Sequence, residues 1–560
     1  MIVLTKETGT EGDSECVPRE PARRQAPRKD QGAPPFDDSR VVEDRCQQLF
    51  SGMLLWLKGQ VSGEACARFD AVEPELVKRI LELGRLLVLL FLTCAEERVR
   101  VQVPVRLVEG GRLYERSPRK ARHIGTFFGK VWFWRTHMYC PPGRDRRGRG
   151  FFPLDAAIGL TRDGFSWLVM SLAIRLAVQM PFERAAGTMK RFVGWSPATR
   201  TIEELVLGLG ALAPEFQESA PAPKDDGDVL VTEIDSKGAP TATETELKKR
   251  RQERKPNPHP ESQRHRGRAK RKKAGPKRRR APGDKSKNAK MATMVVMYTL
   301  RSTTGTNGER MLIGPLNKRY YASFGPKKYA YEVARREAIK RGFGPDSGKL
   351  IQFVGDGDDD LEVYRKEYFA DYDPSLIVTT IDLPHVMEYI WSAGGALFAE
   401  GKGELSAWAH KQKKRLLDSR TDLILADLRA ALNAIPKTGP GNKGRRERLS
   451  KALGYIESNA YRMNYRELID QDLELASGVV EGAVKHAIGY RFDHGGMRWI
   501  RERAEALLQL RCLALNGQWE DFFAWLRQRV DRPGDARVRL RRRDAAPLPK
   551  VSPLVLRKVA

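Results

Sequence analysis

The stretch SGVVEGAVKHAIGYRFDHGGMRW, residues 477–499, does most to decide the fold of this 560-residue chain. Its first half has helical spacing, because Val480, Val484 and Ile488 repeat at intervals of four. Glu481 lies at the edge of this apolar stripe, so its carboxylate can face a cleft while the helix packs on a core. An exposed ion pair between Glu481 and Lys485 is the other interpretation.

Two aspartates far upstream follow apolar runs that predict strands. Asp235 ends VLVTEID, and Asp356 follows KLIQFVG. Two carboxylates at strand ends and one on a helix offer the hard oxygen ligands that can bridge two Mg²⁺ ions about 3.5–4 Å apart. We therefore predict a two-metal phosphoryl-transfer site made of Asp235, Asp356 and Glu481, in which Mn²⁺ can replace Mg²⁺.

Neighbouring acids leave alternatives open for this site. Glu233 and Asp228 are alternatives to Asp235, and Asp358 is the alternative to Asp356. The run GDGDDDLE also has the acid spacing of an EF-hand loop. However, Leu361 stands where that loop needs glycine, and a strand precedes it where a helix is required. We expect no calcium loop there.

The charge of the chain points to a polyanionic partner. The formal net charge is +29, which favours nucleic acid first and an anionic membrane surface second. Residues 247–290 hold 20 Lys and Arg against 3 acids. We interpret them as a basic arm that neutralises DNA phosphates, with a solvated spacer as the alternative. The candidate contacts in the arm are Lys270, Arg271, Lys272, Arg278, Arg279 and Arg280.

The sequence predicts a cytoplasmic protein without a membrane span. The N-terminus lacks the basic and apolar regions of a secretory signal. The most apolar run, residues 86–94, is too short to cross a bilayer. Six cysteines lie far apart, so we expect neither a disulfide framework nor a zinc site.

Composition and periodicity predict a multidomain α+β protein. Strands are expected at 229–235, 291–300, 310–321, 349–354 and 376–381, with helices at 327–341 and 384–398. The predicted parts are a disordered tail at 1–40, a mainly helical region at 41–215, an α/β core at 229–399 interrupted by the basic arm, a helical insertion at 400–475, the last part of the core at 476–526, and a basic flexible tail at 527–560.

Residues 182–207 read as helix, turn, helix. The second helix is expected to expose Thr199, Arg200 and Glu203, as a DNA-reading helix-turn-helix would. Arg200 is the best candidate for a base contact, because arginine can bond guanine through two donors. An ordinary helical hairpin is the alternative. Arg498 is a further candidate for a backbone contact.

The order of several motifs resembles that of a known family. IDLPHVMEY supplies Asp382 and His385 in an Asp-x-x-His motif. YIESNAYRMNYRELI, SGVVEGAVKHAIGYRF, GGMRW and LRCLALNGQWEDFFAW follow, and FFPLDAAIGL lies upstream. Over residues 40–525 this order resembles the DDE transposases of bacterial insertion sequences, specifically the ISKra family of the Mutator-like branch.

The resemblance implies an RNase H-like core, with Asp235 on the first strand, Asp356 past the fourth and Glu481 on a later helix. It also implies metal-dependent DNA cleavage and strand transfer at the ends of an insertion sequence. Asp382 and His385 would orient the acids or the DNA, with a structural core role for His385 as the alternative.

The partners implied are element ends, target DNA and further copies of the chain assembled on DNA, in a bacterial cytoplasm near the nucleoid. Two other hypotheses remain open at this point. One is a non-catalytic DNA-binding relative, and the other is an RNase H-like structure-specific nuclease.

Overall fold

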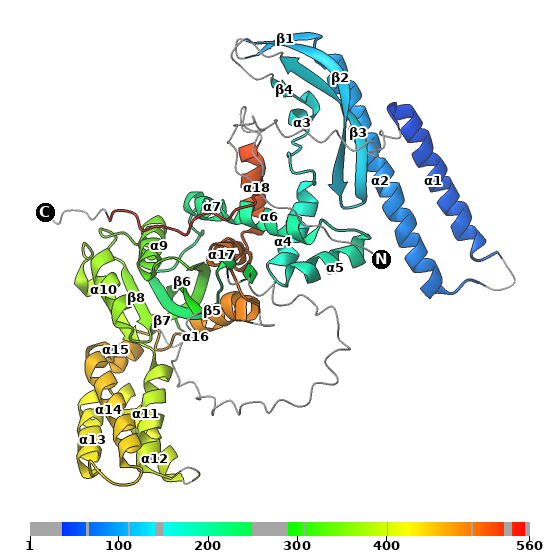
Figure 1. The fold of residues 1–560 in the computed structure, drawn as a ribbon. Coiled ribbons are helices and arrows are strands. Elements are labelled where there is room, and N and C mark those ends of the chain that lie inside the picture. Colours follow the sequence, from blue (N-terminus) through cyan, green and yellow to red (C-terminus); the bar gives the residue numbers. More distant parts are fainter. Residues whose placement is uncertain are drawn as a thin grey trace, which may run out of the picture. The chain divides into compact units, whose positions relative to one another are not determined.

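The chain forms two compact units, which are described separately (Figure 1). The first comprises Met1–Cys66, Leu86–His123 and Trp132–Phe152, and the second comprises Ala67–Arg85, Ile124–Val131 and Pro153–Ala560. The computed structural model describes residues 36–62, 66–109, 112–140, 149–245, 247–248, 289–305, 309–399, 401, 403–493, 497–530 and 540–554. No helix in these ranges is long and apolar enough to span a membrane.

The first unit combines helices with a four-stranded sheet in the order β1-β2-β3-β4. Its elements are α1 (Ser39–Gly59), the second half of α2 (Phe69–Gln102), β1 (Arg106–Glu109), most of β2 (Arg112–Thr126) and β3 (Gly129–Cys140), and β4 (Arg149–Phe151). Glu96 on α2 accepts hydrogen bonds from the Thr136 N–H and hydroxyl on β3, both at 2.6 Å. The region at 41–215, predicted to be mainly helical, thus also contains a sheet with two long strands, β2 and β3.

The second unit begins with a group of short helices. They are α3 (Pro153–Ala157), α4 (Trp167–Ala177), α5 (Phe182–Val193), α6 (Thr199–Gly210) and α7 (Ala213–Ser219). The predicted pair of helices is present as α5 and α6, and Gly194 ends α5 in the left-handed conformation. However, α6 is buried from Glu204 to Gly210. Only its first turn is accessible, so α6 does not offer the exposed length of a DNA-recognition helix.

The end of the described chain covers part of α6. The Leu540 and Arg541 N–H groups donate to Asp163 at 2.8 and 3.0 Å. A Cβ on Gly208 would lie 1.5 Å from the Leu540 carbonyl oxygen, so this crossing requires glycine. The tail segment 540–554 is thus packed onto the second unit, with its first residues over α6 and with the Ser552 N–H donating to Glu332 of the helix at Lys327–Lys340.

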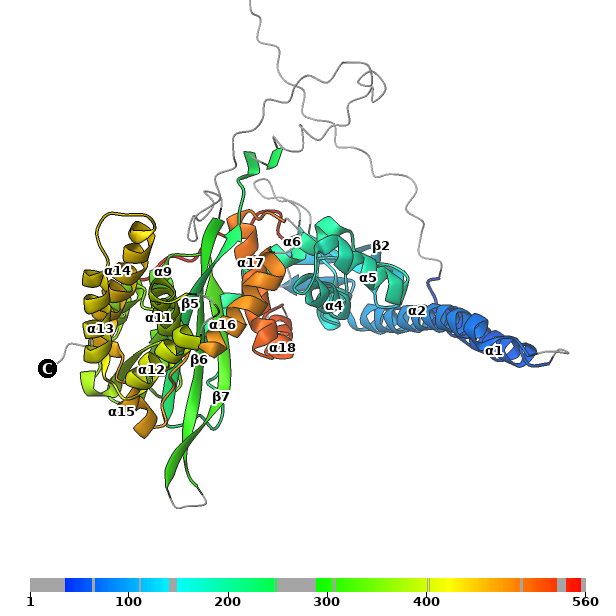
Figure 2. The same ribbon diagram turned by 90° about the horizontal axis from the view of Figure 1, so that it is seen from below.

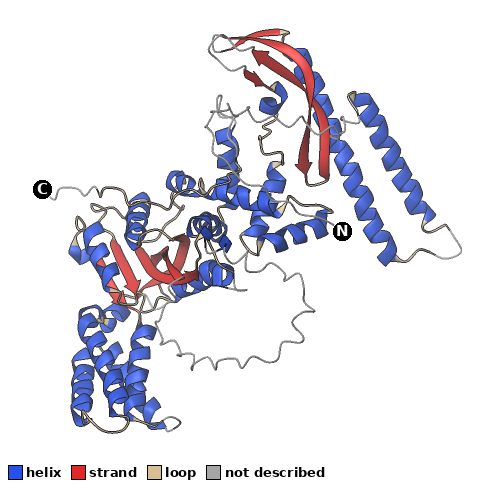
Figure 3. Ribbon diagram, viewed as in Figure 1, coloured by secondary structure: helices blue, strands red, loops and turns tan. Residues whose placement is uncertain are grey.

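A five-stranded mixed sheet forms the centre of the second unit (Figure 3). Its order is β7-β6-β5-β8-β9, so the strands stand third, second, first, fourth and fifth in chain order. β5 is antiparallel to β6 and parallel to β8, and β8 is parallel to β9. The strands are β5 (Val229–Pro240), β6 (Ala289–Thr304), β7 (Arg310–Ser323), β8 (Leu350–Gly355) and β9 (Ile377–Ile381). All five predicted strands are confirmed.

Alternating side chains of β5 face two different layers of helices, as the period of a strand requires. Leu230 and Ile234 join the core formed with α9 (Lys327–Lys340) and α10 (Asp359–Tyr368). Val229 and Val231 join the core formed with α16 (Gly478–Val484) and α17 (Arg501–Leu515). Figure 2 shows α16 and α17 beside β5, β6 and β7. The acids at positions 233 and 235 belong to this second face.

A bundle of helices separates β9 from α16. The sequence predicts an insertion at 400–475, but the bundle begins earlier, with α11 at Leu383–Leu397, which was expected to belong to the core. Its members are α11 (Leu383–Leu397), α12 (Gly403–Leu417), α13 (Thr421–Ala434), α14 (Asn442–Asn459) and α15 (Tyr465–Asp470). α16 continues into a π-helix, η4 (Lys485–Asp493), and the last helix is α18 (Trp519–Val530). Arg491 on η4 donates to the Ala177 carbonyl, and Arg511 on α17 (Arg501–Leu515) donates to the Ala487 carbonyl of η4. Both guanidinium groups are buried.

Candidate active site

Asp235 and Asp356 come from neighbouring parallel strands. In the register of β5 and β8, Glu233 lies opposite Val354. Continuing this register by two residues places Asp235 opposite Asp356, immediately past the end of β8. Both aspartates are partly buried. Asp235 therefore lies within β5, just past the part that pairs with β8, and Asp356 lies just past the carboxyl end of β8, where ligands of open α/β sheets commonly bind.

Glu481 on α16 lies close enough to influence Asp235. Burial raises the pKa of Asp235 above its usual range, and the negative charges of Asp356 and Glu481 raise it further. Glu481 itself is exposed. Three carboxylates that are 121 and 125 residues apart in the chain thus share one electrostatic site, and that site is open to solvent.

Glu233 fixes the start of the helix that carries Glu481. Its carboxylate is fully buried and accepts hydrogen bonds from the Val480 N–H and the Tyr298 hydroxyl, both at 2.7 Å. The first N–H groups of a helix have no acceptor within the helix, so these groups and the helix dipole stabilise a carboxylate at the N-terminus. Glu233 is therefore engaged as an anchor for α16, which leaves Asp235 as the acid of β5 that faces the site.

The other alternative acids also have partners elsewhere. Asp228 precedes the opposite end of β5 and accepts from the Ser302 N–H at 2.8 Å. Asp358 caps α10 and pairs with Lys327 at 2.5 Å. These contacts account for both residues without a role at the acid site, and Asp358 provides a cap where the EF-hand interpretation would need a ligand.

Asp382 holds α16 from a second direction. One of its oxygens accepts from the Ser477 N–H at 2.7 Å, and the other accepts from the His385 N–H at 3.0 Å, which caps α11. Asp382 is buried, so these two hydrogen bonds lie out of water. The Asp-x-x-His motif therefore joins the insertion to α16 through its aspartate, a role that the spacing alone does not reveal.

An aromatic cluster lies beside Asp356. Tyr389 on α11 stacks on Tyr455 on α14 with ring centroids 3.9 Å apart, and the His385 ring lies 5.5 Å from Tyr389. The Tyr455 hydroxyl donates to the Asp356 carbonyl oxygen at 2.8 Å. Burial raises the pKa of Tyr455, and the charge of Asp356 adds to this. The insertion thus contacts the acid site directly, which sequence reasoning missed because these residues belong to separate helices.

The donor set is chemically suited to a divalent cation. Its members are carboxylate oxygens, which Mg²⁺ prefers, and a cation would relieve the repulsion that raises the pKa of Asp235. Across the ranges that the structure describes, however, no three His, Cys, Asp or Glu side chains converge closely enough to hold an ion. The chemistry of the site fits a metal, and the side chains would have to close around it.

The candidate DNA contacts fall into three places. Thr199 and Arg200 are exposed on the first turn of α6, and Arg498 is exposed just before α17. All three line one cavity of the second unit. Arg491 and Trp499, by contrast, are buried. The arm candidates Lys270, Arg271, Lys272, Arg278, Arg279 and Arg280 lie outside the described residues.

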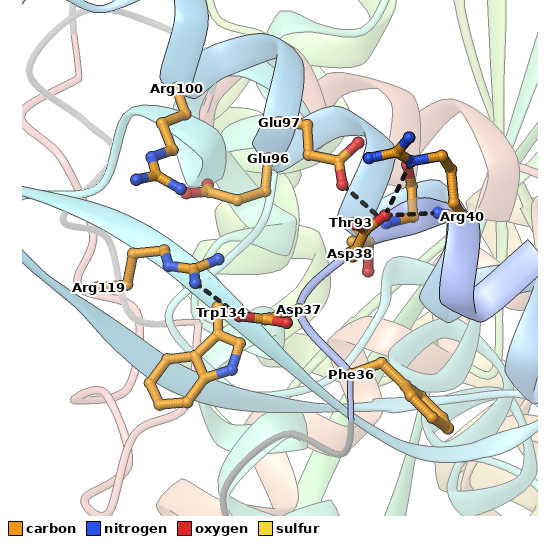
Figure 4. Close-up of a pocket in the computed structure, with 11 residues that line it drawn as sticks. Phe36, Asp37, Asp38, Arg40, Thr93, Glu96, Glu97, Arg100, Arg119 and Trp134 are labelled. Atoms are coloured by element: carbon orange, nitrogen blue, oxygen red, sulfur yellow. Dashed lines mark hydrogen bonds and ion pairs between the residues drawn. The ribbon is translucent and has the colours of Figure 1, made fainter.

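The first unit contains a separate polar cavity of about 360 Å³ (Figure 4). Its charged groups largely satisfy one another. Arg119 pairs with Asp37 at 3.0 Å and its guanidinium lies 5.8 Å from the Trp134 ring centroid, while Glu97 accepts from the Ser39 N–H at 2.7 Å. These contacts fix the start of α1. We interpret this cavity as a structural feature of the first unit, at the place where α1 begins, and not as a ligand site.

Comparisons with known proteins add little to this geometry. No family model matches the chain, and no curated protein matches its sequence. Among solved structures, the fold is similar to a chain of the Drosophila P element transposase strand transfer complex, with a TM-score of 0.29 and 11% sequence identity. The match covers 63% of this chain and 93% of that chain. A likeness at this level carries no argument, so the functional case depends on the site itself.

Proposed function

We propose that the chain is a DDE-type transposase, which cleaves DNA at the ends of an insertion sequence and joins the freed strands to target DNA. The observation that carries this proposal is that the charges of Asp356, just past β8, and of Glu481 on α16 both act on Asp235 of the neighbouring strand β5. The strand order third-second-first-fourth-fifth supports an RNase H-like core around these acids. The motif order supports the ISKra family of the Mutator-like branch.

In this proposal Asp235, Asp356 and Glu481 hold two Mg²⁺ ions, or Mn²⁺ in their place. Bound metal would supply charge stabilisation for both the attacking and the leaving oxygen of a phosphodiester. The other residues of the site position these acids. Glu233 and Asp382 orient α16, and Tyr455 of the aromatic cluster donates to the Asp356 carbonyl. No covalent enzyme intermediate is needed, so no serine or tyrosine nucleophile is required.

The proposed partners are element ends and target DNA, on which several copies of the chain assemble. The net charge of +29 supports a nucleic-acid partner. The proposal places the protein in a bacterial cytoplasm, associated with the nucleoid.

The first prediction is that Asp235→Asn, Asp356→Asn and Glu481→Gln each abolish strand cleavage and leave DNA binding nearly unchanged. Each substitution removes a ligating charge but keeps the shape of the side chain. The first effect is measured as cleavage, with Mg²⁺ or Mn²⁺, of a plasmid that carries the DNA from both sides of the gene, where the element ends are expected. Anisotropy with labelled DNA measures the second.

Asp359→Asn is the matched control, because Asp359 is an exposed acid of the same DGDDD run, on α10. It should cleave normally. Persistent cleavage in Glu481→Gln would refute the acid assignment. A wild-type chain that binds DNA but never cuts it would favour the non-catalytic hypothesis, and cleavage that follows DNA structure without regard to the ends would favour the nuclease.

A further inference from the structure

A large cavity lies in the second unit, beyond the end of β5. Its volume is about 720 Å³, and Phe182 and Trp499 form an apolar part of its wall. Five cationic side chains line it against three carboxylates. The cations are Arg200, Lys248, Arg498, Arg503 and Arg543, and the acids are Glu203, Glu204 and Glu244.

Two helices begin at this cavity. Thr199 and Arg200, the first residues of α6, line it, and so does Ile500, the residue before α17. Neither helix start has a side chain that caps its N–H groups. Uncapped first turns bring partial positive charge and free N–H donors, which together favour phosphate. The backbone therefore adds to the attraction of the arginines for anions.

Part of the cationic charge is free for a ligand. Arg503 pairs with Glu203 at 2.5 Å, and Arg200 pairs with Glu204 at 3.2 Å. Lys248, Arg498 and Arg543 are exposed and form no ion pair within the described residues. These groups are donors that lack acceptors, as in a site for an acceptor-rich molecule.

The cavity is connected to the acid site along β5. The Pro240 carbonyl at the end of β5 accepts from the Trp499 N–H at 3.0 Å. Pro240 is five residues past Asp235, which at 3.3–3.4 Å per residue is roughly 17 Å, or about five base-pair steps of duplex DNA. Lys237 lies between them on the same face as Asp235, and its charge partly opposes the rise in the pKa of Asp235 that burial causes. A cationic side chain thus stands between the acids and the cavity.

We propose that this cavity binds the sugar-phosphate backbone of the DNA strand that extends from the acid site, with Lys237 as the contact in between. The inference depends on the proposed function, because it takes DNA as the substrate of the acids. An extended polyanion suits the size and openness of the cavity. The basic arm also leaves the described chain here, since Lys248 lines the cavity and Ala289 pairs with Pro240.

The second prediction tests this surface by binding alone. The full chain carrying Glu481→Gln is titrated with a labelled duplex of random sequence over a salt series. Adding Arg498→Ala and Arg543→Ala should weaken binding roughly tenfold and reduce the slope of log K against log salt by about two. Lys237→Gln should reduce the slope by about one.

The matched control carries Lys413→Ala and Arg527→Ala in place of the two arginine substitutions. These two residues, on α12 and α18, are also exposed and also form no ion pair within the described residues. The control should keep affinity and slope nearly unchanged, and thermal melting verifies that every variant folds. An unchanged slope in the Arg498 and Arg543 variant, or an equal drop in the control, overturns the proposal. Because cleavage is absent from this assay, a failure here is distinct from a failure of the acid assignment.

Discussion

Glu233 shows how a single residue can stand next to a reactive site without belonging to it. It lies two residues before Asp235 on the same face of β5, yet its oxygens are engaged by Val480 and Tyr298. Burial raises its pKa to about 7, and the charges of Glu474 and Asp382 act in the same direction. A carboxyl of this kind takes up a proton as the protein folds near neutral pH.

The third prediction follows from the sign of this shift. The folded-state pKa of about 7 exceeds the ordinary 4.5. Between these values the folded state therefore binds more protons, and stability falls as pH rises, by up to about 3 kcal/mol. Glu233→Gln should flatten this dependence, as urea unfolding at about pH 5 and about pH 8 would measure. The half-buried Glu474 and the buried Glu505, whose pKa values burial also raises, should preserve part of the slope.

At the scale of elements, α16 is a short helix fixed by two carboxylates from different strands. Glu233 belongs to β5, and Asp382 follows β9 directly. α16 and the π-helix η4 that continues it have 7 and 9 residues, and helical segments this short depend on tertiary packing for their stability. The position of Glu481 therefore depends on these anchors and on the packing of Val480 and Val484.

The fourth prediction is that Asp382→Ala lowers both stability and cleavage. It removes the acceptor of two backbone N–H groups, at Ser477 and His385, and should cost about 2–4 kcal/mol of unfolding free energy. Asp382→Asn keeps one carbonyl oxygen and should lose less. Urea unfolding and hydrogen exchange at α16 measure these effects. Exchange in α16 that is equally slow in Asp382→Ala and in the wild type would contradict an anchoring role.

At the scale of the whole molecule, the basic arm is inserted between two paired strands. β5 and β6 are antiparallel neighbours from Val229 opposite Leu300 to Pro240 opposite Ala289. The sheet therefore holds both ends of the arm without help from the residues between them. On the proposed function, the charge of the arm would act on DNA without disturbing the pairing of β5 with β6.

The fifth prediction concerns this arm. Replacing residues 249–288 with a neutral linker of the same length should weaken binding to all DNA and reduce its salt dependence, because fewer counterions are released. The core should melt as before. A shuffled arm of identical composition is the control and should bind like the wild type. If the neutral linker left the salt slope unchanged, the arm would not contact DNA.

Much of the central sheet could be predicted from the sequence. Strands such as MATMVVMYTL in β6 are continuous apolar runs buried on both faces, and such runs are easy to recognise in a sequence. The candidate acids could be selected for the same reason, since each aspartate closes an apolar run. α10 was missed, because its DDDLEVY start resembles a polar loop and its cap forms only once Asp358 meets the Asp360 N–H.

The supporting contacts could not be predicted. An acid such as Glu233 within an apolar strand indicates that a buried carboxyl needs a partner. The sequence does not show that the partner is Val480, which lies 247 residues away. The stack of Tyr389 on Tyr455 also depends on how the insertion folds back. Thr199 and Arg200 on α6 are exposed as predicted, but the amphipathic pattern of the helix does not reveal that α17 and Leu540 cover its remaining length. Pairing over such separations is set by tertiary structure.

The crossing of Leu540 over Gly208 has a consequence for how the protein is made. A ribosome releases the chain from its N-terminus, so the strands that carry Asp235 and Asp356 emerge long before α17 and the segment that closes over α6. The face of α6 at Gly208 therefore stays uncovered until nearly the whole chain has been made, and the second unit can close only after synthesis reaches Leu540.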